Sequence, residues 1–206
     1  MTRAVTVGPL LLAVAIAAGA SGCGGSGTST APATVPSGST AATTTSTVPA
    51  QTGGIDTMPG AGTTSVTAPA QAKKALLAAI RIARHEGYDR VVFEFANTLP
   101  GYTISYARPP FREDGSGKPI AVDGGAFVLV RMEPASGYDL AHARLVYQGP
   151  GRIAGAEHGT SIVREVVRTG DFEAVLGWVI GLEERVDFRV LRLDDPPRLV
   201  IDFRNH

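Results

Sequence analysis

The sequence predicts an all-β fold, an antiparallel β-sandwich spanning residues 73–206 and preceded by a disordered stalk. Apolar and polar residues alternate with a period of two along several segments, as they do in strands with one buried face. Turn-forming residues separate these segments. The chain has one cysteine, so no internal disulfide is available, and roughly 130 residues are enough to build a single hydrophobic core.

Residues 1–22 have the plan of a secretory signal peptide. Arg3 precedes an apolar stretch from Ala4 to Ala18, which Gly8 and Pro9 interrupt. The stretch is too short and too weakly apolar for a membrane span, whereas a charged start, an apolar centre and small residues at the end are typical of an export signal. We therefore expect an exported protein.

Cys23 directly follows Ala20, Ser21 and Gly22. Small residues before a cysteine resemble the bacterial lipobox, in which the cysteine is acylated, for example by palmitate, and becomes the new N-terminus. Two or more acyl chains on one residue hold a protein stably at a bilayer. We expect attachment through Cys23 to the extracytoplasmic face of the cell membrane. Two alternatives stay open: cleavage after Ala18-Gly19-Ala20, which would release a soluble protein, and retention of the segment as a weak anchor.

Residues 23–72 are predicted to form a disordered linker. From Gly24 to about Ala70 the chain is almost entirely Thr, Ser, Ala, Gly and Pro, and Asp56 is its only charged residue. Such a segment cannot bury enough apolar surface to offset its conformational entropy. Whether it is O-glycosylated or bare, it would hold a domain away from the membrane.

The strands of the domain follow from the alternation. They are predicted at residues 90–95, 102–106, 126–130, 163–168, 188–190 and 198–203. The run at 126–130 is continuously apolar, as in a strand covered on both faces. Asp194-Asp195-Pro196-Pro197 predicts a turn before the last strand, because proline cannot extend a ladder.

Residues 73–86 fit two structures. Leu76, Leu77, Ile80 and Ala83 would form a helical stripe, and the local propensity favours a helix. The alternation of apolar residues over 76–82 favours a strand, and the family resemblance below agrees with it. We expect the strand.

Two segments are similar in phase and chemistry. Residues 89–95 and 197–203 each begin near an arginine, present three apolar residues to one face and carry an acid on the other. Half-exposed antiparallel strands often have this pattern. Two sheets of similar build, packed as a sandwich, would also account for it.

Three segments resemble the AMIN-like domain of actinobacterial lipoproteins. They are Gly87–Phe95, Pro119–Phe127 and Pro196–Phe203, and their order and spacing agree across nearly the whole globular part. The resemblance implies a β-sandwich of AMIN-like type without an attached catalytic domain. It also implies a role in targeting proteins to peptidoglycan or to an envelope partner. It carries over no binding residues.

Composition and motifs argue against several function classes. The formal charge is zero, so no field attracts nucleic acid. The histidines lack recognisable zinc-ligand spacing. Gly115-Ser116-Gly117-Lys118 is followed by Pro119 where a phosphate loop needs Ser or Thr. No nucleophile–base pair or acid pair can be named, so we expect neither an enzyme nor a cofactor, and an envelope hydrolase is a distant alternative.

The candidate binding residues are Tyr106, Arg108, Phe111 and Arg112. They lie on a proline-stiffened loop, where binding residues often occur. Aromatic faces stack on sugar rings, and arginine binds carboxylates of the kind that muramyl peptides carry. Trp178 is expected in the core instead. The leading hypothesis is a non-catalytic module that binds cell-wall glycan, peptidoglycan or an envelope partner. The alternative is a structural protein whose sheet edge pairs with another envelope protein.

Overall fold

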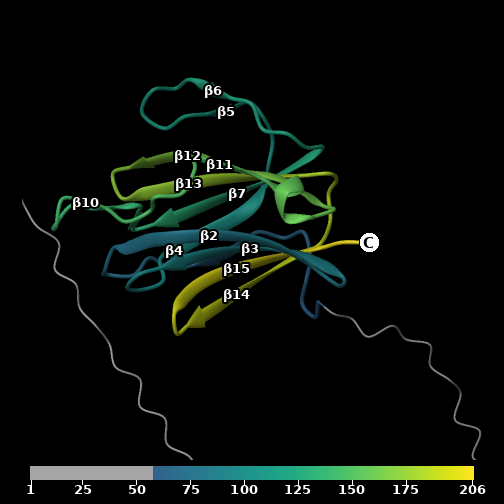
Figure 1. The fold of residues 1–206 in the computed structure, drawn as a ribbon, viewed down its shortest axis with the longest axis horizontal. Coiled ribbons are helices and arrows are strands. Elements are labelled where there is room, and N and C mark those ends of the chain that lie inside the picture. Colours follow the sequence, from purple (N-terminus) through teal and green to yellow (C-terminus); the bar gives the residue numbers. More distant parts are fainter. Residues whose placement is uncertain (1–57) are drawn as a thin grey trace, which may run out of the picture. The chain divides into compact units, whose positions relative to one another are not determined.

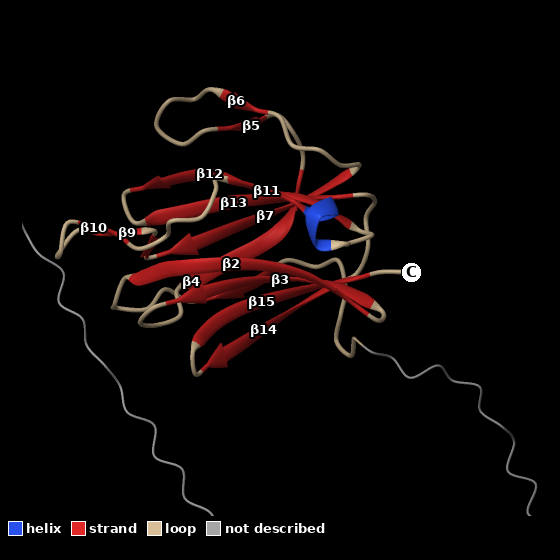
Figure 2. Cartoon of the chain, viewed as in Figure 1, coloured by secondary structure: helices blue, strands red, loops and turns tan. Residues whose placement is uncertain are grey.

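The structure, a computed structural model, describes residues 58–206, which form a two-sheet β-sandwich as the sequence predicts (Figures 1 and 2). The six-stranded sheet has the spatial order β1 (Val66–Ala68), β4 (Gly101–Ala107), β7 (Ala126–Glu133), β13 (Val175–Leu182), β12 (Val163–Phe172) and β11 (Arg152–Ala154). The five-stranded sheet has the order β14 (Phe188–Asp194), β15 (Pro197–Arg204), β3 (Tyr88–Phe95), β2 (Ala75–His85) and β8 (Ala135–Ser136).

Within each sheet, neighbouring strands are antiparallel, except that β8 pairs with β2 in parallel. Two small hairpins and one helical turn complete the described residues: β5 (Phe111–Arg112) with β6 (Pro119–Ile120), β9 (Tyr138–Asp139) with β10 (Arg144–Leu145), and the 3-10 turn η1 (Gly155–His158). The predicted turn at 194–197 joins β14 to β15.

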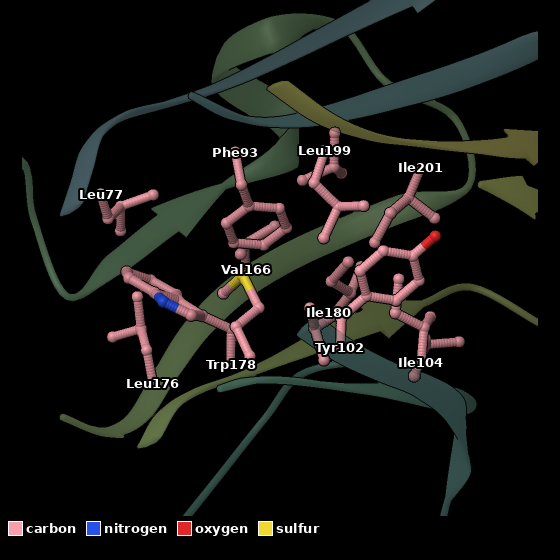
Figure 3. Close-up of a cluster of buried hydrophobic side chains, with 14 of the residues drawn as sticks. Leu77, Phe93, Tyr102, Ile104, Val166, Leu176, Trp178, Ile180, Leu199 and Ile201 are labelled. Atoms are coloured by element: carbon pink, nitrogen blue, oxygen red, sulfur yellow. The ribbon is translucent and has the colours of Figure 1, made fainter. Parts of the chain in front are cut away.

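The core fills the space between the inner faces of the two sheets (Figure 3). Trp178 of β13 is fully buried, as predicted, and its ring meets the edge of Phe93 from β3 at a centroid distance of 6.1 Å. The ring of Tyr147 packs against the same tryptophan at 5.7 Å. Because these aromatic rings come from both sheets and from a connecting segment, they fix the spacing of the sandwich.

Residues 75–85 form a strand, which confirms the expectation for the ambiguous segment. β2 pairs with β3 along most of its length, and Ile82 opposite Val91 lies in the core. An irregularity between Leu77 and Ala79 shifts the alternation, which explains why the apolar pattern also fitted a helix. Pairing with β3 overrides the local helix propensity.

The packed structure begins before residue 73, the boundary expected from composition. Met58 is fully buried, Gly62 forms a bridge with Phe188 of β14, and β1 pairs with β4 of the other sheet. Residues 58–68 therefore cross from one sheet to the other and close one long side of the sandwich, here called the closed side. Val66–Ala68 belong to a strand although the composition of the segment resembles that of the stalk. The rest of the predicted stalk, with Cys23 and residues 1–22, lies outside the described residues.

The two similar segments, 89–95 and 197–203, pair with each other in one sheet as β3 and β15, whereas their likeness suggested separate sheets. The register places Arg90 opposite Asp202, and the two side chains form an ion pair of 2.6 Å. Arg189 of β14 binds the other oxygen of this fully buried carboxylate at 2.9 Å. The hydrogen bond to Asp202 raises the pKa of Arg90. The shared pattern of arginine and acid thus serves cross-strand pairing.

A strap of residues 107–125 lies over the outer face of the six-stranded sheet, where Figure 1 shows the β5–β6 hairpin above β12 and β13. The Asp114 amide donates to the Thr169 carbonyl at 2.8 Å, and the Asp123 amide donates to Glu165 Oε1 at 2.5 Å. A Cβ on Gly181 of β13 would collide with the Asp123 carbonyl oxygen. The strand β13 was not predicted from the sequence. Its outward positions include Gly177 and Gly181, which lie beneath the strap, so the strand lacks the alternation of apolar and polar residues.

Candidate functional site

Of the four residues chosen from the sequence, Tyr106 lies near the end of β4 and the other three lie at the start of the strap. The two aromatic side chains are partly or fully buried, whereas the two arginines are exposed. Tyr106 is partly buried at the end of β4, where its hydroxyl donates to the Val186 carbonyl at 2.5 Å and accepts from the Val186 amide at 3.1 Å. The Arg185 guanidinium lies 4.0 Å from the ring centroid. Burial raises the pKa of this phenol. Tyr106 therefore joins β4 to the segment before β14.

Phe111 is likewise a packing residue. Its side chain is buried and meets Phe127 edge-to-face at 5.3 Å, which holds the strap on the sheet. Arg108 and Arg112 are exposed, and Arg112 donates to the Gly117 carbonyl at 2.9 Å within the β5–β6 hairpin. Both aromatic rings make packing contacts within the domain, and a binding role for the four residues stays a prediction.

The second long side of the sandwich, here called the open side, lies between the edges of β2 and β11. β8 pairs with β2 only at Ala75 and Leu76. Beyond Leu76, no strand within residues 58–206 pairs with this edge of β2. In an antiparallel ladder every second residue of an edge strand directs its N–H and C=O away from its neighbour. The open side therefore presents backbone donors and acceptors in a row.

A concave site lies on the open side, and we call it the β2 groove. Its volume is about 530 Å³, and it is lined by residues 78–80 of β2, residues 146–150, Arg152 and Ile153 of β11, and Glu157 and His158 of η1. Four other concavities of the described chain are smaller, between about 200 and 420 Å³. Ligand pockets typically measure about 300–1,000 Å³.

The side chains at the bottom of the groove are small or fixed in place. Ala78, Ala79 and Ile80 of β2 line the groove and are partly buried. Tyr147 is buried, its hydroxyl donates to the Pro150 carbonyl at 2.8 Å, and burial raises the pKa of its phenol. The tyrosine thus holds the 146–150 wall against the core and presents little ring surface to the groove.

Arg152 connects the groove to the strap. It forms an ion pair with Glu165 of β12 and donates to the Ala121 carbonyl at 2.7 Å. Glu165 in turn accepts the Asp123 amide. The side chain of Arg152 is still half exposed, so it lies at the rim of the groove. The other charged or titratable rim groups are the exposed Glu157 and His158.

A buried carboxylate positions the η1 wall of the groove. Asp89, at the start of β3, is fully buried. Its Oδ2 accepts backbone N–H groups from Ser161, Ile162 and Val163 at 2.9, 2.6 and 3.1 Å. Its Oδ1 accepts from Asn205 Nδ2 at 2.8 Å. Because residues 161–163 follow η1 after only two residues, this contact fixes the wall relative to the five-stranded sheet.

Within residues 58–206 the structure has neither a cluster of metal-ligating side chains nor a helix that could span a membrane. No group of three or more His, Cys, Asp or Glu side chains within residues 58–206 is placed to hold a metal ion. No helix in that part of the chain is long and apolar enough to cross a membrane.

Sequence reasoning missed the groove as a site. Ala78, Ala79 and Pro150 carry no chemical signal of their own. The only sequence signal was the alternation of β2, which indicates an edge or central strand equally. The groove exists because β8 and β11 are too short to cover their neighbours.

The comparisons with known proteins agree with this architecture. The family model of the AMIN-like domain matches residues 75–205, which is more than half of the chain. A comparison with curated proteins finds no significant match. The family match begins at β2, so the strand β1 and the buried Met58 precede it.

Proposed function

The chain belongs to the AMIN-like domain family, and from this premise we propose that it is an envelope lipoprotein whose domain binds peptidoglycan. AMIN-like domains are generally non-catalytic binding modules. The domain would hold the membrane-attached protein to the cell wall, and the stalk would set the distance between them.

One observation carries the binding proposal, namely the β2 groove. It combines an accessible strand edge, small apolar residues and a rim with Arg152, Glu157 and His158. Concave sites with an apolar base and a few polar groups are the usual form of ligand sites. The wall positions are held by Asp89 and Tyr147, so the groove is formed before any ligand arrives.

Co-sedimentation with purified sacculi tests this function. The full-length chain in mild detergent is expected to sediment with sacculi, and Ala78→Trp is expected to abolish sedimentation because it fills the groove. Arg108→Ala and Arg112→Ala test the loop predicted from the sequence: a loss of sedimentation in either variant would place binding on that loop, and wild-type sedimentation in both would rule that prediction out. If the wild type stays in the supernatant, the peptidoglycan proposal is wrong.

A protein partner is the second candidate, and the unpaired edge of β2 favours it specifically. Another envelope protein could add a strand there by main-chain hydrogen bonds. This alternative predicts no sedimentation with bare sacculi. It also predicts a crosslink between a photoreactive residue at position 79 and a second protein in intact cells.

The anchor is proposed from the sequence alone. The apolar stretch, the small residues and Cys23 support acylation of Cys23 and a position at the extracytoplasmic face of the cell membrane. A fatty-acid probe should label the wild type in growing cells. Cys23→Ser should lose the label and release the protein from the membrane fraction. Labelling that persists in Cys23→Ser would contradict the anchor.

A further inference from the structure

We infer that the outer face of the five-stranded sheet is a second binding site, which takes an anionic polymer through carboxylate or phosphate groups held between Arg90 and Arg189. The inference goes beyond the proposed function, because it concerns another face of the domain and another class of ligand. Three observations carry it: two arginines share one buried carboxylate, both approach the same aromatic ring, and their face has a surplus of positive charge.

The outer face of the five-stranded sheet is uncovered. In Figure 1 no described segment lies over it, whereas the strap lies over the outer face of the other sheet. Side chains alternate along a strand, so the neighbours of the core residues Val91 of β3 and Ile201 of β15 point outward. The register brings Arg90, Asp202 and Arg189 side by side across β3, β15 and β14. This row therefore lies on the solvent side of the sheet.

Asp202 holds both arginines in a fixed orientation. Its carboxylate is fully buried and accepts from Arg90 Nε at 2.6 Å, from Arg90 Nη2 at 2.9 Å and from Arg189 Nε at 2.9 Å. Arg189 Nη2 is also 2.9 Å from this carboxylate. The Nη1 group of each arginine has no acceptor within residues 58–206. Both arginines thus keep N–H donors for a further anion, and their bonds to Asp202 fix where these donors lie.

The ring of Tyr88 supports the same two guanidinium groups. Arg90 Cζ lies 5.0 Å from the centroid of this ring, and Arg189 Cζ lies 5.6 Å from it. The ring of His85 stacks on Tyr88 at a centroid distance of 4.8 Å. These contacts limit the motion of both arginines, so they lose little side-chain entropy when an anion binds.

The charges of this face do not balance. Five arginines stand beside three acids: Arg81, Arg90, Arg189, Arg198 and Arg204, with Glu94, Asp187 and Asp202. Glu94 and Asp187 each pair with one arginine, whereas Asp202 pairs with two. The side chains of Arg90 and Arg189 are only 26% and 16% exposed, so water screens their surplus charge incompletely. A carboxylate or phosphate between the two would neutralise this charge.

A polymer fits this face better than a small molecule does. None of the five concavities described above is lined by Arg90 and Arg189 together, so the site is a shallow part of the sheet surface. Arg81 on β2 and Arg204 at the end of β15 lie on the same face. A chain with repeated anionic groups can therefore contact more than the central pair of arginines.

Two further features narrow the inference. Asp194 and Asp195 lie at the β14–β15 turn, where Arg198 donates to the Asp195 carbonyl. These acids disfavour an anion at the turn, which places the site at the end of the face with Tyr88. At the centre of the face, Val200 is only 1% exposed, so the face offers little apolar surface for insertion into a membrane.

Binding to three soluble polymers tests the site: polyphosphate, polygalacturonate and neutral dextran. The full-length chain carries Cys23→Ser in these assays, so that no acyl chain takes part. We expect binding to at least one anionic polymer, weaker at high salt, and none to dextran. Binding of polyphosphate alone would identify phosphate as the ligand group, and binding of polygalacturonate alone would identify carboxylate. In an amide NMR titration the polymer should shift residues 88–92 and 200–204 more than residues 78–80 of the β2 groove.

Arg189→Lys is the site variant, and Arg131→Lys is its control. Lysine keeps the charge that pairs with Asp202 but loses the planar fork of donors. Arg131 lies on β7 in the other sheet, is half exposed and pairs with Glu133. We expect Arg189→Lys to weaken binding about tenfold and Arg131→Lys to leave it within about twofold of the wild type. Urea unfolding followed by Trp178 fluorescence checks that each variant folds. The NMR titration of the wild type locates the site even if Arg189→Lys does not fold.

Several results would overturn the inference. If neither anionic polymer binds, the face is not a site for them. Equal losses in Arg189→Lys and Arg131→Lys would show that only general positive charge attracts the polymer. Polymer-induced shifts confined to other residues would place the site elsewhere. Binding to phosphatidylglycerol vesicles but to neither polymer would assign the face to a lipid surface. Sedimentation with sacculi is a separate question: if the wild type does not sediment but the polymer binds, the proposed function falls and this inference stands.

Discussion

Both long sides of the sandwich are bordered by strand edges. The chain covers these edges on one side and leaves part of the β2 edge without a strand partner on the other. On the closed side, residues 58–68 cross from β14 to β4, bury Met58 and pair with both sheets. On the open side, β8 and β11 are two and three residues long, and the outer edge of β2 beyond Leu76 has no strand partner within residues 58–206. The two sheets are similarly wide, so sheet size does not explain the difference.

The difference shows how a sandwich can keep one edge for binding. An unpaired edge is an aggregation hazard, and proteins usually cover it or shorten it. Here the chain covers one side with its own N-terminal segment, which is also the segment that continues toward the proposed anchor. The groove is therefore on the side away from the point where residue 58 joins the domain.

The largest effect is expected from Asp89→Ala, which removes the contact that holds the η1 wall of the open side. The backbone N–H groups of residues 161–163 would lose their acceptor, and those of Ile162 and Val163 are buried. Each unsatisfied group costs about 1–3 kcal/mol, so we expect a loss on the order of 5 kcal/mol. Urea unfolding measures it. A loss under about 1 kcal/mol would show that the wall is held by other contacts.

Phe188→Ala tests the closed side directly. Phe188 is buried, packs against Tyr106 and Phe203, and pairs with Gly62 through its backbone. Truncation of a buried phenylalanine costs about 3–5 kcal/mol. The matched change on the open side is Ile80→Ala, which is only partly buried and should cost less than about 2 kcal/mol. Equal losses in urea unfolding would break the comparison between the sides.

Met58→Ala tests whether the residues before the family match stabilise the domain. Met58 is fully buried although it lies in the composition-defined stalk. We expect a loss of about 2–5 kcal/mol. Ala61→Ser, in the same segment but without a buried side chain, is the control. If Met58→Ala unfolds at the wild-type urea concentration, the closed side does not depend on this segment.

The smallest effect is a fall in stability at high pH, to which one tyrosine on each side contributes. Burial raises the pKa of Tyr106 on the closed side and of Tyr147 on the open side. A raised folded-state pKa means that the stabilisation is complete below the unfolded pKa of about 10 and is lost as the pH rises through the folded value. Tyr106→Phe and Tyr147→Phe should each flatten the decline of the urea midpoint between pH 9 and pH 11. An unchanged slope in both variants would contradict this assignment.

Much of the fold was predictable because strand periodicity is local. Alternation located β3, β4, β12, β14 and β15, a continuous apolar run located β7, and two prolines located the turn at residues 194–197. It failed for β13, where glycines replace outward polar residues under the strap, and for β1, whose small residues resemble the stalk. The AMIN-like resemblance, which the family match confirms, resolved β2 as a strand where propensity favoured a helix.

The candidate site was much less predictable. The loop at 106–112 has the composition of a binding loop, but Tyr106 and Phe111 use their rings for packing. The groove depends on residues such as Ala78 and Pro150, whose importance comes only from what lies opposite them. Sequence reasoning weights chemically distinctive side chains, and this site is built mainly from backbone and small residues.

By itself, the sequence determined the all-β class and the burial of Trp178. These properties follow from local composition and period, which every segment carries independently of its neighbours. Only the tertiary structure decided that β3 and β15 are adjacent, that residues 58–68 belong to the sandwich, and that β2 keeps a free edge. The reason is physical: whether an edge is satisfied depends on which distant strand reaches it, and strand period does not specify that partner.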